Sequence, residues 1–394
     1  MTATMANVDA ALKDDYQPAI RDQLVNAWML LSQIESNSKD VEGRYATLSL
    51  HVGRNSGVGA RAASAALPTA GSQSYIEERV AITRNYGAMA IDGDLIEASA
   101  SDKGSFGRMM DREMKGVVID LKNDVSRQLY NDSTKSIAQC GTTSTDTEIV
   151  LTSPTVAQMR QFSVGMVVDI GTTADYDVIA AGVSITAVGA STITISGSNV
   201  STTSSHYITR AGSDGNELTG LREIVDSAGT LFNVDPTAVP VWKSTETGSV
   251  GTPTELDFEK MIEDIQFQSD QDVNLIITTQ GVRRNFAAQY QADRRYTNTV
   301  DIKAGFKAVT VAAGNVEVPL VVDNDAPNGI AFFLNTAHLC QHQMGNPWSF
   351  MDRDGSALHL VSGYDKYEAY IYNYHELTTD RRNAHGKLTG ITEA

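Results

Sequence analysis

Bulky apolar residues recur along residues 103–131 at steps of three and four, the spacing of one face of an α-helix. Charged residues of both signs stand between them, as on the solvent side of an amphipathic helix. The pattern predicts one long helix of roughly 43 Å, at a rise of about 1.5 Å per residue. The apolar positions are Phe106, Met110, Met114, Val117, Leu121, Val125 and Leu129.

A second amphipathic helix is predicted over residues 17–36. Pro18 stands near its start, and its apolar face recurs at steps of four, four and three. Such a face packs either on the core of its own chain or on a neighbouring chain, and the pattern favours neither. The residues of this face are Ile20, Leu24, Trp28 and Leu31.

Residues 44–91 contain two predicted strands, Tyr45–Val52 and Tyr75–Tyr86, and a segment between them that cannot form a core. Fifteen of the 22 residues at positions 53–74 are Gly, Ala, Ser or Thr, and only Val58 and Leu67 are sizeable aliphatic residues. Unstructured loops of this length are uncommon within compact domains. We expect a long hairpin that projects from the body and is ordered by another molecule; a flexible surface loop is the alternative.

Composition changes at residue 145. Residues 145–209 hold no lysine and one arginine, and Ser and Thr occupy 21 of the 65 positions. Short alternating runs separated by glycines predict a small all-β module, a barrel or a sandwich, inserted as a unit.

The remainder of the chain, from about residue 220, alternates between helical and strand patterns. Thr254–Asp257 is a helix-start signal before a periodic apolar run. In the closing strand the tyrosines at 370, 372 and 374 fall on one face. The other predicted elements are strands at Val273–Thr278, Val316–Val322 and Ile330–Leu334 and a helix at Gly281–Gln291.

Charge and composition exclude several functions. The 394 residues suffice for two or three domains, and 31 Lys and Arg against 48 Asp and Glu give a net charge of −17. This excess disfavours sequence-independent binding of nucleic acid and attraction to anionic membranes. No apolar run approaches the roughly 20 residues of a membrane helix, and the start lacks a secretion signal. Two cysteines, Cys140 and Cys340, favour a reducing, cytoplasmic origin.

The charge is unevenly distributed. Residues 44–91 hold five arginines against Glu77 and Glu78, a net charge of +3, so the other 346 residues carry −20. A basic arm on an acidic body is complementary to other copies of that body. The arginines are Arg44, Arg54, Arg61, Arg79 and Arg84.

The motifs that suggest chemistry are incomplete. Gly57–Ala62 resembles a shortened dinucleotide fingerprint, but no periodic helix follows it. His338 and His342 would share a helix face as metal ligands do, yet no second ligand pair stands at zinc-site spacing. Asp323–Gly329 and Asp352–Gly355 fit turns better than calcium loops. We therefore expect no catalytic residue, metal or cofactor.

The order of these parts resembles the major capsid proteins of tailed bacteriophages, the Hong-Kong-ninety-seven-like fold family. Nearly the whole chain takes part, with further echoes in Val316–Asp323, in Ala326–Gly329 before Ile330–Leu334, and in the tyrosine-rich closing strand. The resemblance implies an α+β capsid fold. Its parts would be an amino-terminal arm (1–43), an extended β-hairpin loop (44–98), a peripheral domain with a long spine helix (99–144), an inserted all-β domain (145–212), an axial α/β domain (213–344) and peripheral return strands (345–394).

The resemblance further implies a structural protein of the virion. Copies would assemble in the host cytoplasm into hexamers and pentamers of an icosahedral shell, which encloses double-stranded DNA without sequence-specific binding. The five hairpin arginines and the four apolar residues of the first helix would contact neighbouring subunits. A scaffolding protein, a portal and a decoration protein would be further partners. Only 43 residues precede the hairpin, so either a scaffolding segment has been removed or scaffolding is a separate protein, and the starting Met1 favours a separate protein.

One feature of the hairpin refines this expectation. Some family members join a loop lysine to a neighbour's asparagine, but no lysine lies between Lys39 and Lys103, so this hairpin cannot form that cross-link. Two other functions stay open: a β-rich, adhesin-like surface-binding protein that uses residues 145–209, and an enzyme with a metal on His338 and His342.

Overall fold

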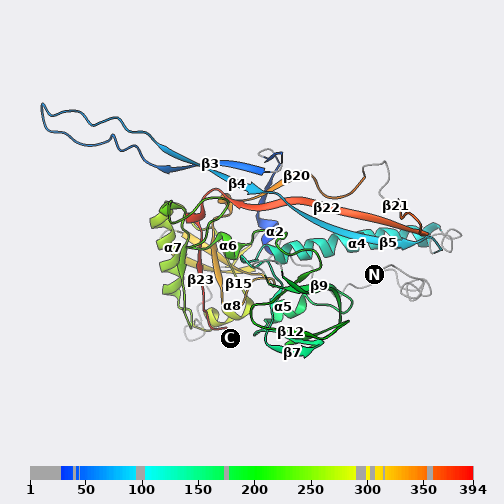
Figure 1. Cartoon of the computed structure of the whole chain (residues 1–394). Helices are drawn as coiled ribbons and strands as arrows, with labels where there is room; N and C mark the ends of the chain where they lie inside the picture. Colours follow the sequence, from blue (N-terminus) through cyan, green and yellow to red (C-terminus); the bar gives the residue numbers. More distant parts are fainter. Residues whose placement is uncertain are drawn as a thin grey trace.

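The computed structural model describes residues 28–38, 41–43, 45–94, 103–172, 177–289, 299–301, 307–313, 316–352 and 358–393. They form an α+β fold, as the sequence predicted, with a central body, a long ribbon lying along a helix, a β module and a projecting hairpin (Figure 1).

The body is built on a mixed seven-stranded sheet with a core on each face. Alternate residues of its central strands enter opposite cores: Ile276 and Phe333 pack under the helices α7 (Glu255–Ser269) and α8 (Gln280–Gln289), whereas Ile277 packs on the other face. The strands, in sheet order, are β14 (Thr245–Thr247), β23 (Gly386–Leu388), β19 (Ala331–Leu334), β15 (Leu275–Thr278), β18 (Val316–Val322), β17 (Lys307–Ala313) and β16 (Thr299–Asp301).

The helices of the body follow the predicted signals. The capping box at Thr254 is confirmed, because Thr254 and Asp257 exchange side-chain-to-backbone hydrogen bonds at the start of α7 (Glu255–Ser269). The predicted helix at 281–291 is α8 (Gln280–Gln289). Shorter elements are α6 (Leu221–Ile224) and the 3-10 turns η1 (Pro240–Trp242), η2 (Thr336–His338) and η3 (Arg382–Ala384).

The predicted long helix is α4 (Lys103–Gln128), and it lies along a second sheet. Leu121, Val125 and Leu129 are buried, which confirms the predicted apolar face at these positions. The strands of this sheet are β1 (Glu35–Asn37), β20 (Leu339–Phe350), β22 (Lys366–Thr379), β21 (His359–Leu360) and β5 (Thr83–Asp92), and β5 pairs with β22 over ten residues.

Two predicted elements need correction. The predicted strand Tyr75–Tyr86 is two strands, β4 (Ser74–Ala81) and β5, because β4 pairs with the hairpin strand β3 (Tyr45–Gly53) and β5 pairs with β22. The helix predicted to reach residue 36 ends at Gln33 as α2 (Met29–Gln33). Glu35–Asn37 instead pairs in parallel with β20, an edge pairing that local periodicity does not reveal.

The β module hangs below the body and α4 (Figure 1). It has its own core, and a bridge between Cys140 and Leu151 joins the two ends of its six-stranded sheet, as in a barrel. The module is not wholly β, since it includes α5 (Val156–Arg160). Its strands are β6 (Ala138–Gln139), β13 (Tyr207–Arg210), β9 (Val167–Gly171), β10 (Val178–Val188), β11 (Thr192–Ile195) and β8 (Glu148–Val150), with β12 (Val200–Thr202) paired to β7 (Thr143–Asp146). Because β6 belongs to this sheet, the module includes residues before 145.

The hairpin is a three-stranded sheet of β2 (Val41–Glu42), β3 (Tyr45–Gly53) and β4. Beyond β3 and β4 its loop extends far past the body, at the end of the molecule opposite to the free end of the β5–β22 ribbon (Figure 1).

Candidate assembly surfaces

The base of the hairpin is anchored on its own subunit. Side chains alternate along β3 and β4, so that Ala46, Leu50 and Val80 are buried. Leu50 belongs to the main core of the body, and Ile76 packs against it. The hairpin is therefore fixed at one end, and its loop is carried away from the body.

Beyond the strands, short-range contacts hold the two arms of the loop together. The Asn55 side chain accepts a hydrogen bond from the Gly57 amide (2.7 Å) and donates one to the Gly71 carbonyl (3.0 Å). A Cβ atom at Gly57 would lie 2.7 Å from a backbone oxygen, so the close approach of the arms requires glycine there. At the tip, Val58 and Leu67 are 84% and 85% exposed. Neither side chain is therefore covered by apolar residues of the described part of the chain.

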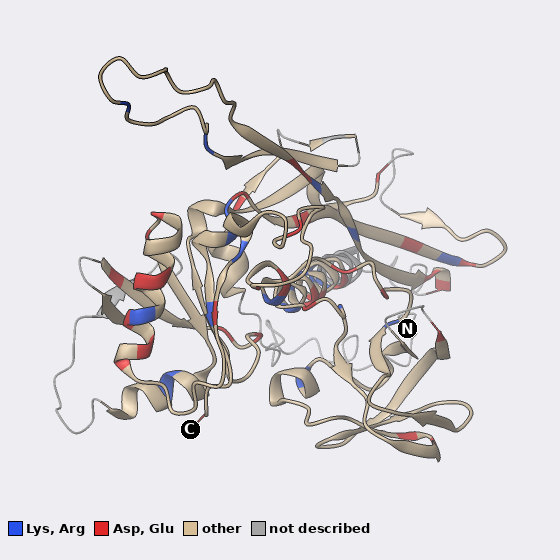
Figure 2. Cartoon of the chain, turned by 60° about the vertical axis from the view of Figure 1, so that its left-hand side comes forward, with Lys and Arg blue, Asp and Glu red and all other residues tan. Residues whose placement is uncertain are grey.

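The structure separates the predicted contact arginines into different groups. Arg54 and Arg61 are exposed on the loop, and neither forms an ion pair with any described residue. Arg79 pairs with Glu77 (2.9 Å) on the outer face of β4, and Arg84 lies beyond the bend on β5. Arg44 lies outside the described residues. Figure 2 shows the projecting loop with basic positions and no acidic ones. Within the described residues, Arg54 and Arg61 are therefore the unpaired cations of the projecting loop.

Glu78 changes the charge of the hairpin, and counting charges in the sequence missed it. It is fully buried on the inner face of β4, which it shares with Ile76 and Val80. Burial, and to a smaller extent the nearby Asp380, raises the pKa of Glu78 to about 8. The side chain is therefore mostly uncharged at neutral pH, and the basic excess of the hairpin is larger than predicted. The period-two alternation of side chains along β4, which puts Glu78 on the same face as Ile76 and Val80, was the sequence signal that could have placed it inside.

The first helix packs on its own chain where it is described. The Trp28 indole donates to Asn123 Oδ1 on α4 (2.7 Å), and Lys122 Nζ lies 5.2 Å from the centre of the Trp28 ring. Met29 and Leu30 are buried, and Leu31 packs on the same core. Contact of Trp28 and Leu31 with a neighbour stays a prediction, and Ile20 and Leu24 lie outside the described residues.

A row of tyrosines covers the face of the β5–β22 ribbon opposite to the buried residues Met89, Ile91 and Ala369. This tyrosine face consists of Tyr86 on β5 and Tyr370, Tyr372 and Tyr374 on β22. Tyr86 is 50% exposed and meets Tyr374 edge to face, with ring centres 6.0 Å apart. Partly exposed aromatic side chains in a row are typical of protein interfaces.

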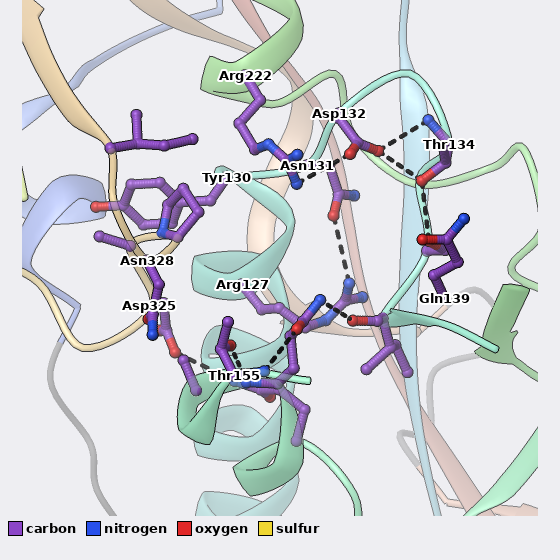
Figure 3. Close-up of a pocket in the computed structure, with 18 of the residues that line it drawn as sticks. Arg127, Tyr130, Asn131, Asp132, Thr134, Gln139, Thr155, Arg222, Asp325 and Asn328 are labelled. Carbon is purple, nitrogen blue, oxygen red and sulfur yellow. Dashed lines mark hydrogen bonds and ion pairs between the residues drawn. The ribbon is translucent and has the colours of Figure 1, made fainter. Parts of the chain in front are cut away.

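Several charged groups lie where the module meets the body, beside a cavity of about 380 Å³ (Figure 3). Its charged groups are paired with one another: Arg127 with Glu217 (2.6 Å), Arg222 with Asp132 (2.9 Å), and Arg160 with Asp325. The Arg160 and Gln161 side chains both bind Asp325 and so tie α5 to the body. Because these charged groups are paired with one another, they indicate a structural interface between the module and the body.

The histidines singled out in the sequence are engaged in ordinary hydrogen bonds. His338 lies 2.9 Å from Asp380 and 3.0 Å from Gln271, and His342 lies 2.7 Å from Thr378. The two do not share a helix, because β20 begins at Leu339. Within the described ranges, no group of three or more His, Cys, Asp or Glu side chains is placed to hold a metal ion, and no helix is long and apolar enough to cross a membrane.

No protein-family model matches this sequence, and no curated protein is significantly similar to it. Solved structures do match it over almost its full length. A chain of the cyanophage A-1(L) capsid asymmetric unit has a TM-score of 0.59 at 11% identity, over 97% of this chain and 98% of that one. The SrpI encapsulin complex from Synechococcus elongatus has a TM-score of 0.52 at 11% identity, over 99% and 96%. The chain therefore has the fold shared by a cyanophage capsid protein and an encapsulin, which is the capsid fold that the sequence predicted.

Proposed function

We propose that this protein is the major capsid protein of a tailed bacteriophage, which assembles with copies of itself into the hexamers and pentamers of an icosahedral head. The observation that carries the proposal is the hairpin. Its base is fixed on the body, the arms of its loop are held together, and no described part of its own subunit lies beneath its tip (Figure 1). Such an element gains apolar and ionic contacts only from another molecule. The capsid fold makes another copy of the same chain the natural partner.

The hairpin supplies two kinds of contact. Val58 and Leu67 offer apolar surface, and Arg54 and Arg61 offer charge that no described residue neutralises. The remainder of the subunit is strongly acidic, so any neighbouring copy presents a complementary field. The hairpin lacks lysine, so the proposed contact is noncovalent.

The tyrosine face is the surface that we assign to receive the hairpin of a neighbouring copy. Guanidinium groups stack on tyrosine rings, and aliphatic side chains pack beside them. The ribbon and the hairpin lie at opposite ends of the subunit (Figure 1), so a head-to-tail arrangement of copies brings one hairpin onto the next ribbon and closes into a ring.

The protein is proposed to act without catalysis, in the virion and after assembly in the host cytoplasm. Its acidic body would repel packaged DNA and leave the genome free in the interior. A separate scaffolding protein, a portal and a decoration protein are the further partners we propose. The adhesin-like alternative finds no support in the comparisons, because the capsid likeness extends over nearly the whole chain.

Expression of the full chain, followed by sedimentation velocity and electron microscopy, tests the proposal. We expect capsomers or closed shells, with and without a co-expressed scaffold. The matched control joins Gly53 to Ser74 through Asn-Gly, which replaces the loop by a tight turn and leaves β3 and β4 paired. This variant should remain a folded monomer. A wild-type protein that stays monomeric under all conditions, or a loopless variant that assembles normally, would contradict the proposal.

The contents of the particles distinguish two containers that use this fold. Particles isolated from an infected or induced host should hold double-stranded DNA if the chain is a phage capsid protein. Particles that instead hold a packaged protein would assign the chain to an encapsulin-like compartment.

A further inference from the structure

Glu78 is a buried acid that the fold leaves without a partner. Its side chain is 0% exposed, and within the described residues neither carboxyl oxygen has a hydrogen-bond partner. Placing an ionised carboxylate in such a site costs several kcal/mol, so the buried position is favourable only for the neutral carboxylic acid. Native proteins bury few such groups, and each one calls for an explanation.

Among the described residues, no cation compensates Glu78. On β3, the residue opposite Glu78 is Leu48. On β4, Ile76 and Val80 share its face, while Arg79 turns outward to bind Glu77. Next to the end of β22, Asp380 is the charged group that acts on Glu78, and it adds repulsion. On η2, His338 Nδ1 lies 2.9 Å from Asp380 and offsets that carboxylate only when the imidazole is protonated.

Glu78 also lies at the point where the hairpin meets the body. Four residues later the chain leaves the hairpin sheet at Ile82 and enters β5. Near this bend the hairpin is attached by the Arg79 amide, which donates to the Phe232 carbonyl (3.1 Å), and by the buried Val80. The inner face of β4, with Ile76, Glu78 and Val80, is thus the surface that attaches the projecting hairpin to the body. We call this attachment the seat of the hairpin, and the unpartnered Glu78 carboxyl group lies within it.

We propose that Glu78 is a protonation-controlled latch that sets how firmly the hairpin base is seated on the body. The neutral side chain fits the apolar seat. Ionisation drives the carboxylate toward water, which requires β4 to lift and frees the hairpin to change its angle. The latch belongs to the single subunit, so it holds whether or not the chain forms a shell; in a shell it would control the direction in which each arm reaches its neighbour.

The expected pH dependence follows from linkage. In the lifted state Glu78 is solvated and has its ordinary pKa near 4.5, whereas in the seated state burial raises its pKa to about 8. The seated state therefore binds more protons between these values. Seating is fully favoured below about pH 4.5 and weakens by up to about tenfold per pH unit until about pH 8, above which it is constant.

Hydrogen exchange of the full-length protein between pH 5 and 9 tests the latch, with each amide's intrinsic rate divided out. In the wild type, protection of residues 74–82 should fall by up to tenfold per pH unit and level off near pH 8, while amides of α7 report on unrelated changes. In Glu78→Gln the same peptide should stay protected at every pH. Glu77→Gln, one residue away and exposed, should keep the wild-type profile.

A second variant guards against a folding defect in the first. Asp380→Asn removes the repulsion acting on Glu78, so its levelling-off point should shift to lower pH. A wild-type profile that is flat, or a Glu78→Gln profile that keeps the wild-type slope, would overturn the latch and leave the proposed shell function untouched. An Asp380→Asn profile that levels off at the wild-type pH would show that Asp380 does not act on the latch as described.

Discussion

Reversing the charge of Arg54 and Arg61, the two unpaired arginines of the hairpin loop, should block assembly without unfolding the subunit. Arg54 and Arg61 are exposed and make no ion pair with a described residue, so Arg54→Glu with Arg61→Glu removes no contact that stabilises the monomer beyond a backbone hydrogen bond of Arg61. An exposed ion pair contributes roughly 0.5 kcal/mol, and a like-charge pair costs about the same. Two reversals therefore change each hairpin contact by about 2 kcal/mol, which is roughly a 30-fold loss in association constant.

The assay is the protein concentration at which particles first appear, measured by light scattering and checked by electron microscopy. The double reversal should raise this threshold at least tenfold, and added salt should narrow the difference because it screens exposed charges over about 8 Å. Arg54→Lys with Arg61→Lys keeps the charge but loses the planar guanidinium that stacks on tyrosine, so its threshold should lie between those of the wild type and the double Glu variant. If the double Glu variant assembles at the wild-type concentration, the proposed hairpin contact is wrong.

Three further predictions concern the subunit itself. Arg382 donates hydrogen bonds to four carbonyl groups between Glu223 and Gly229, so Arg382→Met should lower the free energy of unfolding in urea by about 4 kcal/mol, whereas a surface-like change near zero would refute its role as a clamp. Thr254→Ala removes the capping box of α7 and should cost about 1 kcal/mol in the same assay, with Thr254→Ser near wild type as the control. Burial lowers the pKa of His385 to about 3, so on acidification the unfolded chain takes up a proton before the folded chain does. The free energy of unfolding should therefore fall between pH 6.5 and 3 by up to about 1.4 kcal/mol per pH unit. His385→Gln should lose that part of the slope, and an unchanged slope would contradict the burial argument.

Local patterns in the sequence sufficed wherever one element decides its own structure. The apolar stripe of α4 and the capping box at Thr254 depend on residues three and four positions apart, and both were predicted. The loop between β3 and β4 was recognised because its composition excludes a core.

Long-range pairing was beyond the reach of the same patterns. Nothing near Ile82 marks the bend, since strand-forming residues continue through it; the break exists because β4 and β5 have different partners. The end of α2 is likewise set by the pairing of Glu35–Asn37 with β20, some 300 residues away.

Charge counting failed at the candidate surface for a related reason. It treats every ionisable residue as exposed, whereas Glu78 is buried and Arg79 is already paired. Only the three-dimensional structure separates the two exposed, unpaired arginines of the loop from Arg79, which is paired with Glu77, and from Arg84, which lies on β5. The tyrosine face was visible as an alternation on one strand, but its continuation onto Tyr86 depends on the register of β5 with β22.

The central claim, that the hairpin of one copy docks on the next, is tested most directly by a cryo-electron microscopy map of assembled particles. The map should show each hairpin loop lying on the tyrosine face of a neighbouring subunit, with Arg54 and Arg61 within contact distance of that neighbour. Closed particles in which the hairpins point freely into solvent, or fold back on their own subunit, would contradict the account.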